Sequence, residues 1–404
     1  MVSDTIFFQE PSSTISVFAQ LEIPTLGPQS AAALERAQSG PATNCMNIHL
    51  VATRAVMSAA AAASRVNPGQ VSEWDQRVGA FKEVSFFHSR AWARVLSDAY
   101  GFQPAYFECA VPHAAGLLPA MEVSSWFSRR RGVSLPFTDE CSFLGEDAEA
   151  AKVAVSAMLG HAVARSWSSW EFRGGRAPFG DVPASQTYFG HTLPLDGTVE
   201  ALFARLDGNA RTSVRKAMQC GVAVDFATDL GALRIFHDQL CRTRRRHGLP
   251  PQPFGFFEAI HRHVLLAGLG VVAIARHNGQ PVASAIFFHF GRSAIYKFAA
   301  SEFESRNLQA NHLVLWRAIE RYAAQGFSRL DFGRTSSVNK GLRHFKLAWR
   351  PKEHAIDYVK YDFRRACFVE AEPERTTGWH NRVFRLLPAP VSKLIGTAIY
   401  RHFA

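Results

Sequence analysis

The chain has 404 residues, of which 47% are hydrophobic and 20% charged, which is ordinary for a globular protein and enough for two domains. Its formal net charge of +11 favours a polyanionic partner such as a phosphorylated cofactor, tRNA or an anionic lipid. The six cysteines show no C-x-x-C spacing, and no apolar run approaches the roughly 20 residues of a membrane span. We therefore expect a cytoplasmic protein with free thiols and no metal site.

The N-terminal stretch gives the weakest pattern. Residues 1–70 mix Ser, Pro and Ala without sustained periodicity. We expect a poorly ordered extension, with Met46 as an alternative start. A targeting peptide is the weaker alternative, because the Ala-rich run after Arg54 lies too far from Met1 for a secretory signal.

A regular pattern begins near Val71. Its apolar spacing predicts, in chain order, a helix around 92–99, strands at 106–110, 117–126 and 133–137, a helix over 148–167 and a strand at 169–172.

The second half repeats this order. It predicts helices at 202–220 and 233–246, strands at 271–276 and 282–290 joined by the hairpin signal Asn278-Gly279, a strand at 293–300, a helix carrying 315–323 and a strand at 328–332. The closing segments 171–174 and 331–334 are also alike. This weak repeat predicts two copies of one α/β domain, over residues 71–196 and 197–365, and a tail over 366–404.

The end of the second half is typical of a ligand-holding arrangement. A strand is followed by a polar loop, a helix that ends at Gly326 and a second strand beside the first. Backbone N–H groups at the start of that helix would receive an anionic cofactor.

Several short motifs between Ser85 and Asp362 occur in a characteristic order. The most informative are 297–301, 311–313 with Trp316, 331–335, and 341–346 with Trp349. Together they resemble the Fem-type branch of the GNAT acyltransferase superfamily, which includes peptidoglycan interpeptide-bridge aminoacyltransferases and FemAB-like proteins of exopolysaccharide systems. The resemblance implies an α/β fold of tandem GNAT-like domains with mixed central sheets flanked by helices. It also implies transfer of an acyl group from aminoacyl-tRNA or acyl-CoA to an amine.

The loop before the helix is the expected donor site. Its candidate cofactor-binding residues, together with one after the last strand, are Arg306, Asn307, Gln309, Asn311 and Arg334. Ordinary GNAT acetyltransferases carry two glycines in this loop, where backbone amides hold the pyrophosphate of CoA, and this chain has neither. The donor therefore stays open between acyl-CoA and aminoacyl-tRNA. A second departure is Arg350-Pro351, which replaces a glycine that commonly follows the last tryptophan of the family.

Three residues are candidates for catalysis. The resemblance places Lys346 beside donor and acceptor, where it would stabilise the oxyanion; the alternative is a surface lysine. Asp331 would receive a proton from the amine, or else cap a loop or pair with Arg334. Glu302 would face the same cleft, or else cap the helix. His344 is a weaker candidate for a base.

The acceptor is expected to meet basic residues. Candidate substrate-binding residues are Arg211, Arg215, Lys216, Arg244, Arg246 and His247, with Phe345 positioning Lys346. The guanidinium forks suit the phosphates of a nucleotide-linked or lipid-linked acceptor, or of tRNA. The alternative is an ordinary solvated face.

The tail carries apolar residues at helical spacing from Val391 to Phe403, with basic residues nearby. Such a basic amphipathic helix either lies on an anionic membrane face or docks on the domain core. The sequence thus predicts an N-acyltransferase acting on a cell-envelope or exopolysaccharide precursor, cytoplasmic and peripheral at the inner membrane face. The alternatives are an acyl-CoA-dependent acetyltransferase of a small amine and a non-catalytic tRNA or polyanion binder.

Overall fold

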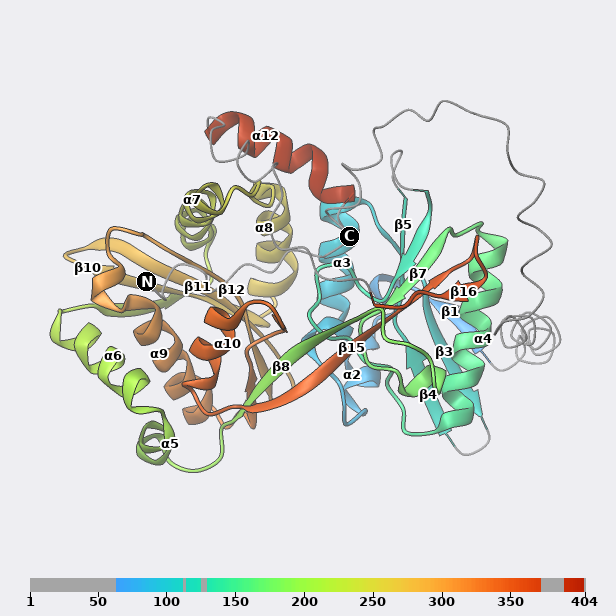
Figure 1. Cartoon of the computed structure of the whole chain (residues 1–404), viewed down its shortest axis with the longest axis horizontal. Helices are drawn as coiled ribbons and strands as arrows, with labels where there is room; N and C mark the ends of the chain where they lie inside the picture. The colour runs from blue at the N-terminus through green and yellow to red at the C-terminus, as the bar shows by residue number, and fades with distance from the viewer. Residues whose placement is uncertain (1–62, 112–113, 125–128, 372–388, 403–404) are drawn as a thin grey trace, which may run out of the picture.

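The computed structural model describes residues 63–402, apart from 112–113, 125–128 and 372–388. Its central feature is a long mixed sheet that runs through both halves of the molecule (Figure 1). In spatial order the strands are β2 (Gln103–Pro104), β5 (Met121–Val123), β6 (Arg131–Val133), β7 (Ser169–Phe172), β15 (Lys352–Asp362), β8 (Gln186–Pro194), β13 (Arg329–Asp331), β12 (Ser293–Ser301), β11 (Gln280–Phe290), β10 (Gly270–His277) and β9 (Ala223–Ala227).

Smaller strands complete the sheets. β14 (Thr335–Ser336) pairs with β8, and β16 (Cys367–Phe368) pairs with β15. A separate sheet is formed by β1 (Ala63–Val66), β3 (Tyr106–Val111) and β4 (Ala114–Leu118). The helices are α2 (Trp74–Gly79), α3 (Arg90–Tyr100), α4 (Ala148–Ala164), α5 (Val199–Arg205), α6 (Gly208–Gln219), α7 (Leu230–His247), α8 (Phe254–Ile260), α9 (Ala310–Ala324), α10 (Lys340–Leu347) and α12 (Ala389–Ile399).

Two strands join the halves. β15 pairs with β7, where Val359 lies opposite Phe172, and also with β8, where Lys352 lies opposite Thr192. β8 in turn pairs with β13. A strand from the second half, β15, therefore reaches the sheet of the first half, while the last strand of the first half, β8, lies beside the sheet of the second.

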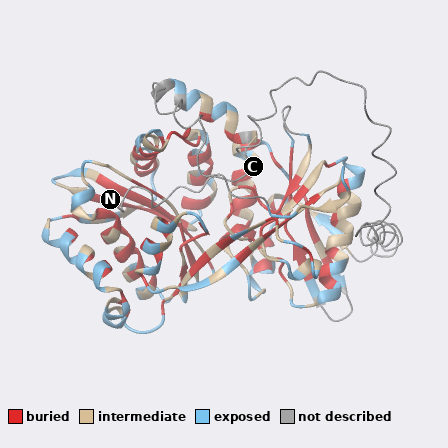
Figure 2. Cartoon of the chain, viewed as in Figure 1, coloured by how far each residue is buried: buried red, intermediate tan, exposed pale blue. Residues whose placement is uncertain are grey.

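Strands β10 to β12 are covered on both faces, which explains their long apolar runs (Figure 2). Alternate side chains enter different cores: Ile286 and Phe288 pack in the cluster with α3, α7 and α8, whereas Ala285 and Phe287 pack in the cluster with α6 and α9. The predicted hairpin between β10 and β11 is confirmed, with φ of 51° at Asn278 and 76° at Gly279.

Strands β12 and β13 are parallel neighbours for only a short distance. They pair at Ser293 with Arg329, Ala294 with Leu330 and Ile295 with Asp331. β12 then continues to Ser301, while the chain after Asp331 turns through Gly333, at φ 68°, to β14 on β8. The two strands diverge immediately beyond Asp331.

Several predicted boundaries are wrong. The strand expected at 117–126 is divided into β4 and β5 next to Pro119, which has no N–H for a ladder. The helix expected at 202–220 is divided because the Asp207 side chain accepts the N–H of Asn209 and starts α6. The strand expected at 133–137 stops at Val133, because Leu135 and Phe137 adopt positive φ angles.

The ends of the chain also differ from expectation. Order begins before residue 70, because β1 pairs with β3 through its backbone, a contact that no side-chain pattern reveals. Residues 1–62, most of the expected extension, lie outside the described residues. In the tail, α12 packs on the body: Tyr400 is buried and donates to the Pro250 carbonyl at 3.2 Å. No described helix has the length and apolarity needed to cross a membrane.

Candidate active site

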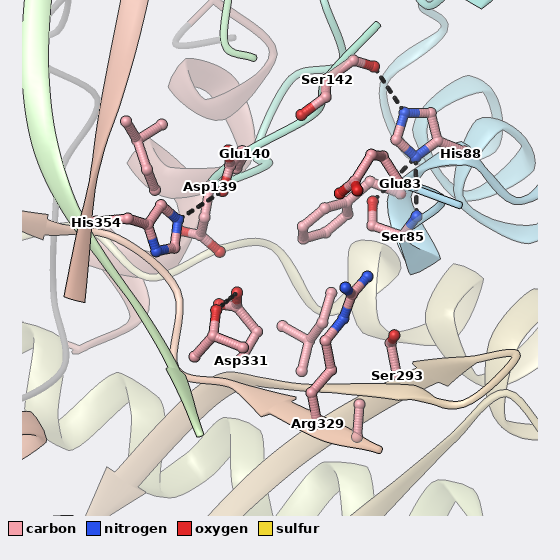
Figure 3. Close-up of a pocket in the computed structure, with 15 residues that line it drawn as sticks. Glu83, Ser85, His88, Asp139, Glu140, Ser142, Ser293, Arg329, Asp331 and His354 are labelled. Carbon is pink, nitrogen blue, oxygen red and sulfur yellow. Dashed lines mark hydrogen bonds and ion pairs between the residues drawn. The ribbon is translucent and has the colours of Figure 1, made fainter. Parts of the chain in front are cut away.

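A cavity of about 280 Å³ lies where the two halves meet, beside the point at which β12 and β13 diverge (Figure 3). Its wall is built from six separate parts of the chain. They are the segment around Glu83 to His88, the loop around Asp139 to Ser142, β8 with Thr192, the start of β12, the strand β13 with Arg329 and Asp331, and β15 with His354. The site therefore exists only in the assembled molecule.

Asp331 is the predicted catalytic residue that lies on this wall. Its carboxylate accepts the Thr192 hydroxyl at 3.3 Å and the Gly333 N–H at 2.6 Å. Burial raises its pKa to about 6, and the neighbouring charges of Glu140 and Asp139 act in the same direction. A carboxyl with this pKa changes its protonation state near neutrality, as a general base requires.

Lys346 lies beneath the wall on α10, a helix that begins where Asn339 accepts the N–H of Leu342 at 3.0 Å. Its Nζ is buried and donates to the carbonyls of Gly333 and Arg334, both at 2.9 Å. Burial lowers its pKa to about 7, although the carboxylates of Asp139 and Asp331 oppose this shift. The structure thus brings Lys346 and Asp331 into one electrostatic cluster.

The cluster contains a second acid–base pair. Lys297, on β12, donates to Asp139 at 2.7 Å. Burial alone would raise the pKa of Asp139, but the charges of Lys297 and Arg334 outweigh it and hold the pKa below the ordinary value. Asp139 is therefore an ionised counter-charge rather than a proton acceptor.

His88 fixes the opposite side of the cavity. Its Nδ1 accepts the Ser85 N–H at 3.1 Å, and its Nε2 therefore donates to the Ser142 carbonyl at 2.9 Å. Burial lowers its pKa to about 4, so the ring is neutral at pH 7. The bond to Ser142 ties the segment before α3 to the loop that carries Asp139 and Glu140, while the bond to Ser85 orients the ring within its own segment.

Glu302 does not join this cluster. It follows the end of β12, roughly 20 Å along an extended strand from the residue opposite Asp331. There it forms an ion pair with Arg242 of α7 at 2.6 Å. The expectation that it faces the same cleft is wrong, because β12 carries it away from the point where the strands diverge.

The predicted donor loop is also separate from Asp331. Arg306 stacks over Phe303, with its Cζ 4.0 Å from the ring centroid, and Gln309 takes φ 57° immediately before α9. Asn311 is buried and donates to the Ser301 hydroxyl at 3.2 Å, whereas Asn307 is exposed. Arg334 lies elsewhere, buried between Tyr188 and Tyr358, and donates to the Tyr358 hydroxyl at 2.8 Å.

The predicted substrate-binding residues lie on two different helices. Arg215 and Lys216 are exposed on α6, and Arg211 donates to the Ala204 carbonyl at 2.9 Å. On α7, Arg244 is buried, while Arg246 donates to the Ser301 carbonyl at 3.3 Å near His247. Phe345 is buried in the core below α9, next to Lys346 in the chain. None of these predicted substrate-binding residues lines the cavity.

Sequence reasoning missed several residues of the wall. Glu83, Asp139, Glu140, Arg329 and His354 received no role, although each lines the cavity. Asp139 is the last residue of the stretch 134–139, which also belongs to the resemblance, and the acidic Glu140 follows it; this was the one available signal. Among the described residues, no cluster of three or more His, Cys, Asp or Glu is placed to hold a metal ion.

Comparisons with known proteins bear on the fold that carries this site. Residues 204–347 match the family model described as an acetyltransferase (GNAT) domain. The solved structure of FemX is 14% identical with a TM-score of 0.58, over 73% of this chain and 96% of that one. The C-terminal domain (DUF2156) of a putative lysylphosphatidylglycerol synthetase from Agrobacterium fabrum is 13% identical with a TM-score of 0.50, over 73% of this chain and 92% of that one. No curated protein matches the chain in sequence. At these identities the structural likeness concerns the fold, and the predicted fold class is confirmed.

Proposed function

Because the chain carries a GNAT domain on a fold of the Fem-type branch, we propose that it transfers an acyl or aminoacyl group to an amine on a cell-envelope or exopolysaccharide precursor. At the coarser level, the chain is a GNAT-type acyltransferase. The Agrobacterium protein is named as a putative lysylphosphatidylglycerol synthetase, and this supports an aminoacyl donor and a lipid-linked acceptor.

The observation that carries the proposal is the electrostatic coupling of Asp331 with Lys346. Asp331 lines the cavity where β12 and β13 diverge, and burial raises its pKa to about 6, while burial lowers the pKa of the neighbouring Lys346, which lies outside the cavity lining, to about 7. In the proposed reaction the amine enters the cavity and Asp331 takes a proton from it as the C–N bond forms. The Lys346 ammonium balances the negative charge that develops on the acyl oxygen.

The exposed basic face of α6 supports a polyanionic donor. Arg215 and Lys216 are exposed within the matched GNAT domain, and the whole chain is strongly cationic. The loop before α9 lacks the glycines that let a pyrophosphate approach the backbone closely, and Arg306 lies over Phe303 there. We therefore favour aminoacyl-tRNA over acyl-CoA as the donor.

The experiment that tests the proposal is a donor titration of the purified full-length chain. Acetyl-CoA and a mixture of tRNAs charged with radiolabelled amino acids are titrated separately at physiological salt, and label transfer to lysine, glucosamine and UDP-linked muropeptide is then measured. Binding of charged tRNA with transfer to an amine supports the proposal. Release of free CoA upon amine addition would make the protein an acyl-CoA enzyme of a small amine. Salt-dependent RNA binding without any turnover would leave only a polyanion binder and would overturn the proposed function.

A further inference from the structure

Acylation of a protonated amine releases a proton that must leave the cavity. As the C–N bond forms, the bond from the acyl carbon to its oxygen or sulfur leaving group breaks. One ammonium proton finishes on the leaving group, and a second is released to water. If Asp331 receives that second proton, it must lose it again before the next turnover. Its raised pKa indicates limited contact with bulk water.

His354 lies between the cavity and solvent. It projects from β15 into the same cavity as Asp331, and its Nε2 lies 3.2 Å from Oε2 of Glu140 (Figure 3). The side chains of His354 and Glu140 are 39% and 34% exposed. One face of this pair therefore meets the cavity and the other meets water.

The backbone of β8 makes room for the ring. Gly190 lies directly opposite His354 in the β8–β15 ladder. A Cβ at this position would lie 2.4 Å from His354 Nε2 and 2.8 Å from Ile356 Cδ1. A side chain at residue 190 would therefore displace the imidazole from its place beside Glu140.

The charges around His354 favour a proton on it. The hydrogen bond to Glu140 raises the pKa of His354 most. The charges of Glu140 on the 139–142 loop, Asp331 on β13 and Glu353 on its own strand act in the same direction, and together they outweigh burial, which lowers the pKa. Two other imidazoles lie near the cavity. Burial lowers the pKa of His88 to about 4, and burial and Lys346 lower the pKa of His191 of β8 to about 4. His354 is therefore the imidazole at this site that can hold a proton near neutrality.

We propose that His354, oriented by Glu140 and seated over Gly190, is the proton exit of the site. This inference rests on the proposed function. His354 Nδ1 receives the proton from the Asp331 carboxyl, directly or through one cavity water, and the imidazolium returns a proton to bulk water while Glu140 holds Nε2. Asp331 is then a carboxylate again, and the net product is one proton in solution for each amide formed.

The kinetic test uses His354→Gln in the full chain, with the donor and amine that support turnover in the titration above. We expect kcat to fall at least about tenfold in dilute buffer, with the KM for the amine unchanged. Added imidazole should restore the rate, because a soluble base replaces the lost proton acceptor. A loss that imidazole does not restore would indicate a structural role and overturn the proposal. His277→Gln, in the β10–β11 hairpin, is the matched control and should leave kcat unchanged.

Two further variants separate position from charge. Gly190→Ala keeps every ionisable group and displaces the ring, so it should reproduce the buffer-dependent loss. Glu140→Gln should lower kcat less than His354→Gln does, while Glu149→Gln, on exposed α4, should have no effect. If Gly190→Ala turns over at the wild-type rate, the position of the His354 ring over Gly190 does not matter for proton release, and that part of the proposal is wrong.

A second measurement does not require turnover. Histidine-labelled protein is titrated by NMR, and His354 is assigned with His354→Gln. Asp331→Asn and Glu140→Gln should each lower the pKa of His354, because each removes a negative charge that faces it. An unchanged His354 pKa in Asp331→Asn would overturn the relay, whereas absence of turnover in every donor assay would instead overturn the proposed function.

Discussion

At the scale of single residues, the candidate site depends on the shifted pKa values of one acidic side chain, Asp331, and one basic side chain, Lys346. Burial makes the Asp331 carboxyl a stronger base and the Lys346 ammonium a stronger acid, so both titrate near neutrality. Lys297 and Asp139 form the adjacent fixed ion pair, at 2.7 Å, that keeps the cluster close to charge balance.

Loss of the Lys346 charge should abolish most transfer. We expect Lys346→Ala to reduce kcat roughly 100- to 1,000-fold, because it removes the proposed oxyanion partner. Donor binding, measured by filter retention of charged tRNA, should be retained. Lys340→Ala, at the exposed start of the same helix, is the matched control. If Lys346→Ala keeps activity within a factor of three of wild type, Lys346 has no role in transfer and serves only to bind the Gly333 and Arg334 carbonyls.

The pH dependence follows from the same pair. Asp331 acts as a carboxylate, so kcat/KM should rise as the pH increases through about 6. Lys346 acts as an ammonium, so kcat/KM should fall as the pH increases through about 7. The profile of initial rates from pH 5 to 9 should be a narrow bell, and residual activity of Asp331→Asn should lack the rising limb. A plateau that extends from pH 7 to 9 would contradict the role given to the Lys346 charge.

At the scale of elements, α12 packs on the body of the protein through some of its residues and exposes apolar side chains to solvent through others. Gly396 packs so closely on the Pro251 carbonyl that a Cβ could not be added, and Tyr400 is buried against Phe137. On the outer side Leu394 is 71% exposed and Val391 40% exposed. The docked interpretation of the tail is therefore correct for one face, and the membrane interpretation stays a prediction for the other.

Membrane attraction through α12 should depend on Leu394. We expect the wild-type chain to sediment with vesicles that contain anionic phosphatidylglycerol, because exposed apolar side chains and positive charge act together there. Leu394→Asp should reduce the bound fraction severalfold. Leu266→Asp, at a leucine that is 68% exposed beyond α8, tests whether any exposed leucine has this effect. Equal sedimentation of both variants and wild type would exclude a membrane role for this face.

At the scale of the whole molecule, each of the two predicted domains depends on strands of the other to complete its sheet. β15 contributes ladder pairs to both halves, and β8 connects it to β13. The cavity lies at this junction, so separation of the halves would dismantle the site. The two halves are therefore better described as one continuous sheet with exchanged strands than as two independent domains.

This shared sheet predicts cooperative unfolding. Urea denaturation followed by far-UV circular dichroism and by tryptophan fluorescence should give one coincident transition for the described body. Val359→Pro, which removes an N–H in the β15–β7 register, should shift the midpoint of that single transition to lower urea. Two separated transitions in the wild-type protein would show instead that the halves fold independently.

The sequence by itself determined the features that depend on local pattern. Strands β10 to β12, helices α7 and α9 and the Asn278-Gly279 turn follow from periodicity and turn chemistry, which act over a few residues. Asp331 and Lys346 became candidates through the motifs 331–335 and 341–346 of the family resemblance. The mixed α/β class followed from the repeat of these elements.

Only the tertiary structure decided how distant segments meet. Glu140 and His354 are separated by 214 residues in the chain, yet they are 3.2 Å apart, because β15 returns to pair with β8. Glu302 has the right residue type but lies at the far end of β12. Strand pairing is set by the burial of whole faces and by backbone hydrogen bonds, which no local pattern encodes, so the membership of the cavity wall could not be read from the sequence.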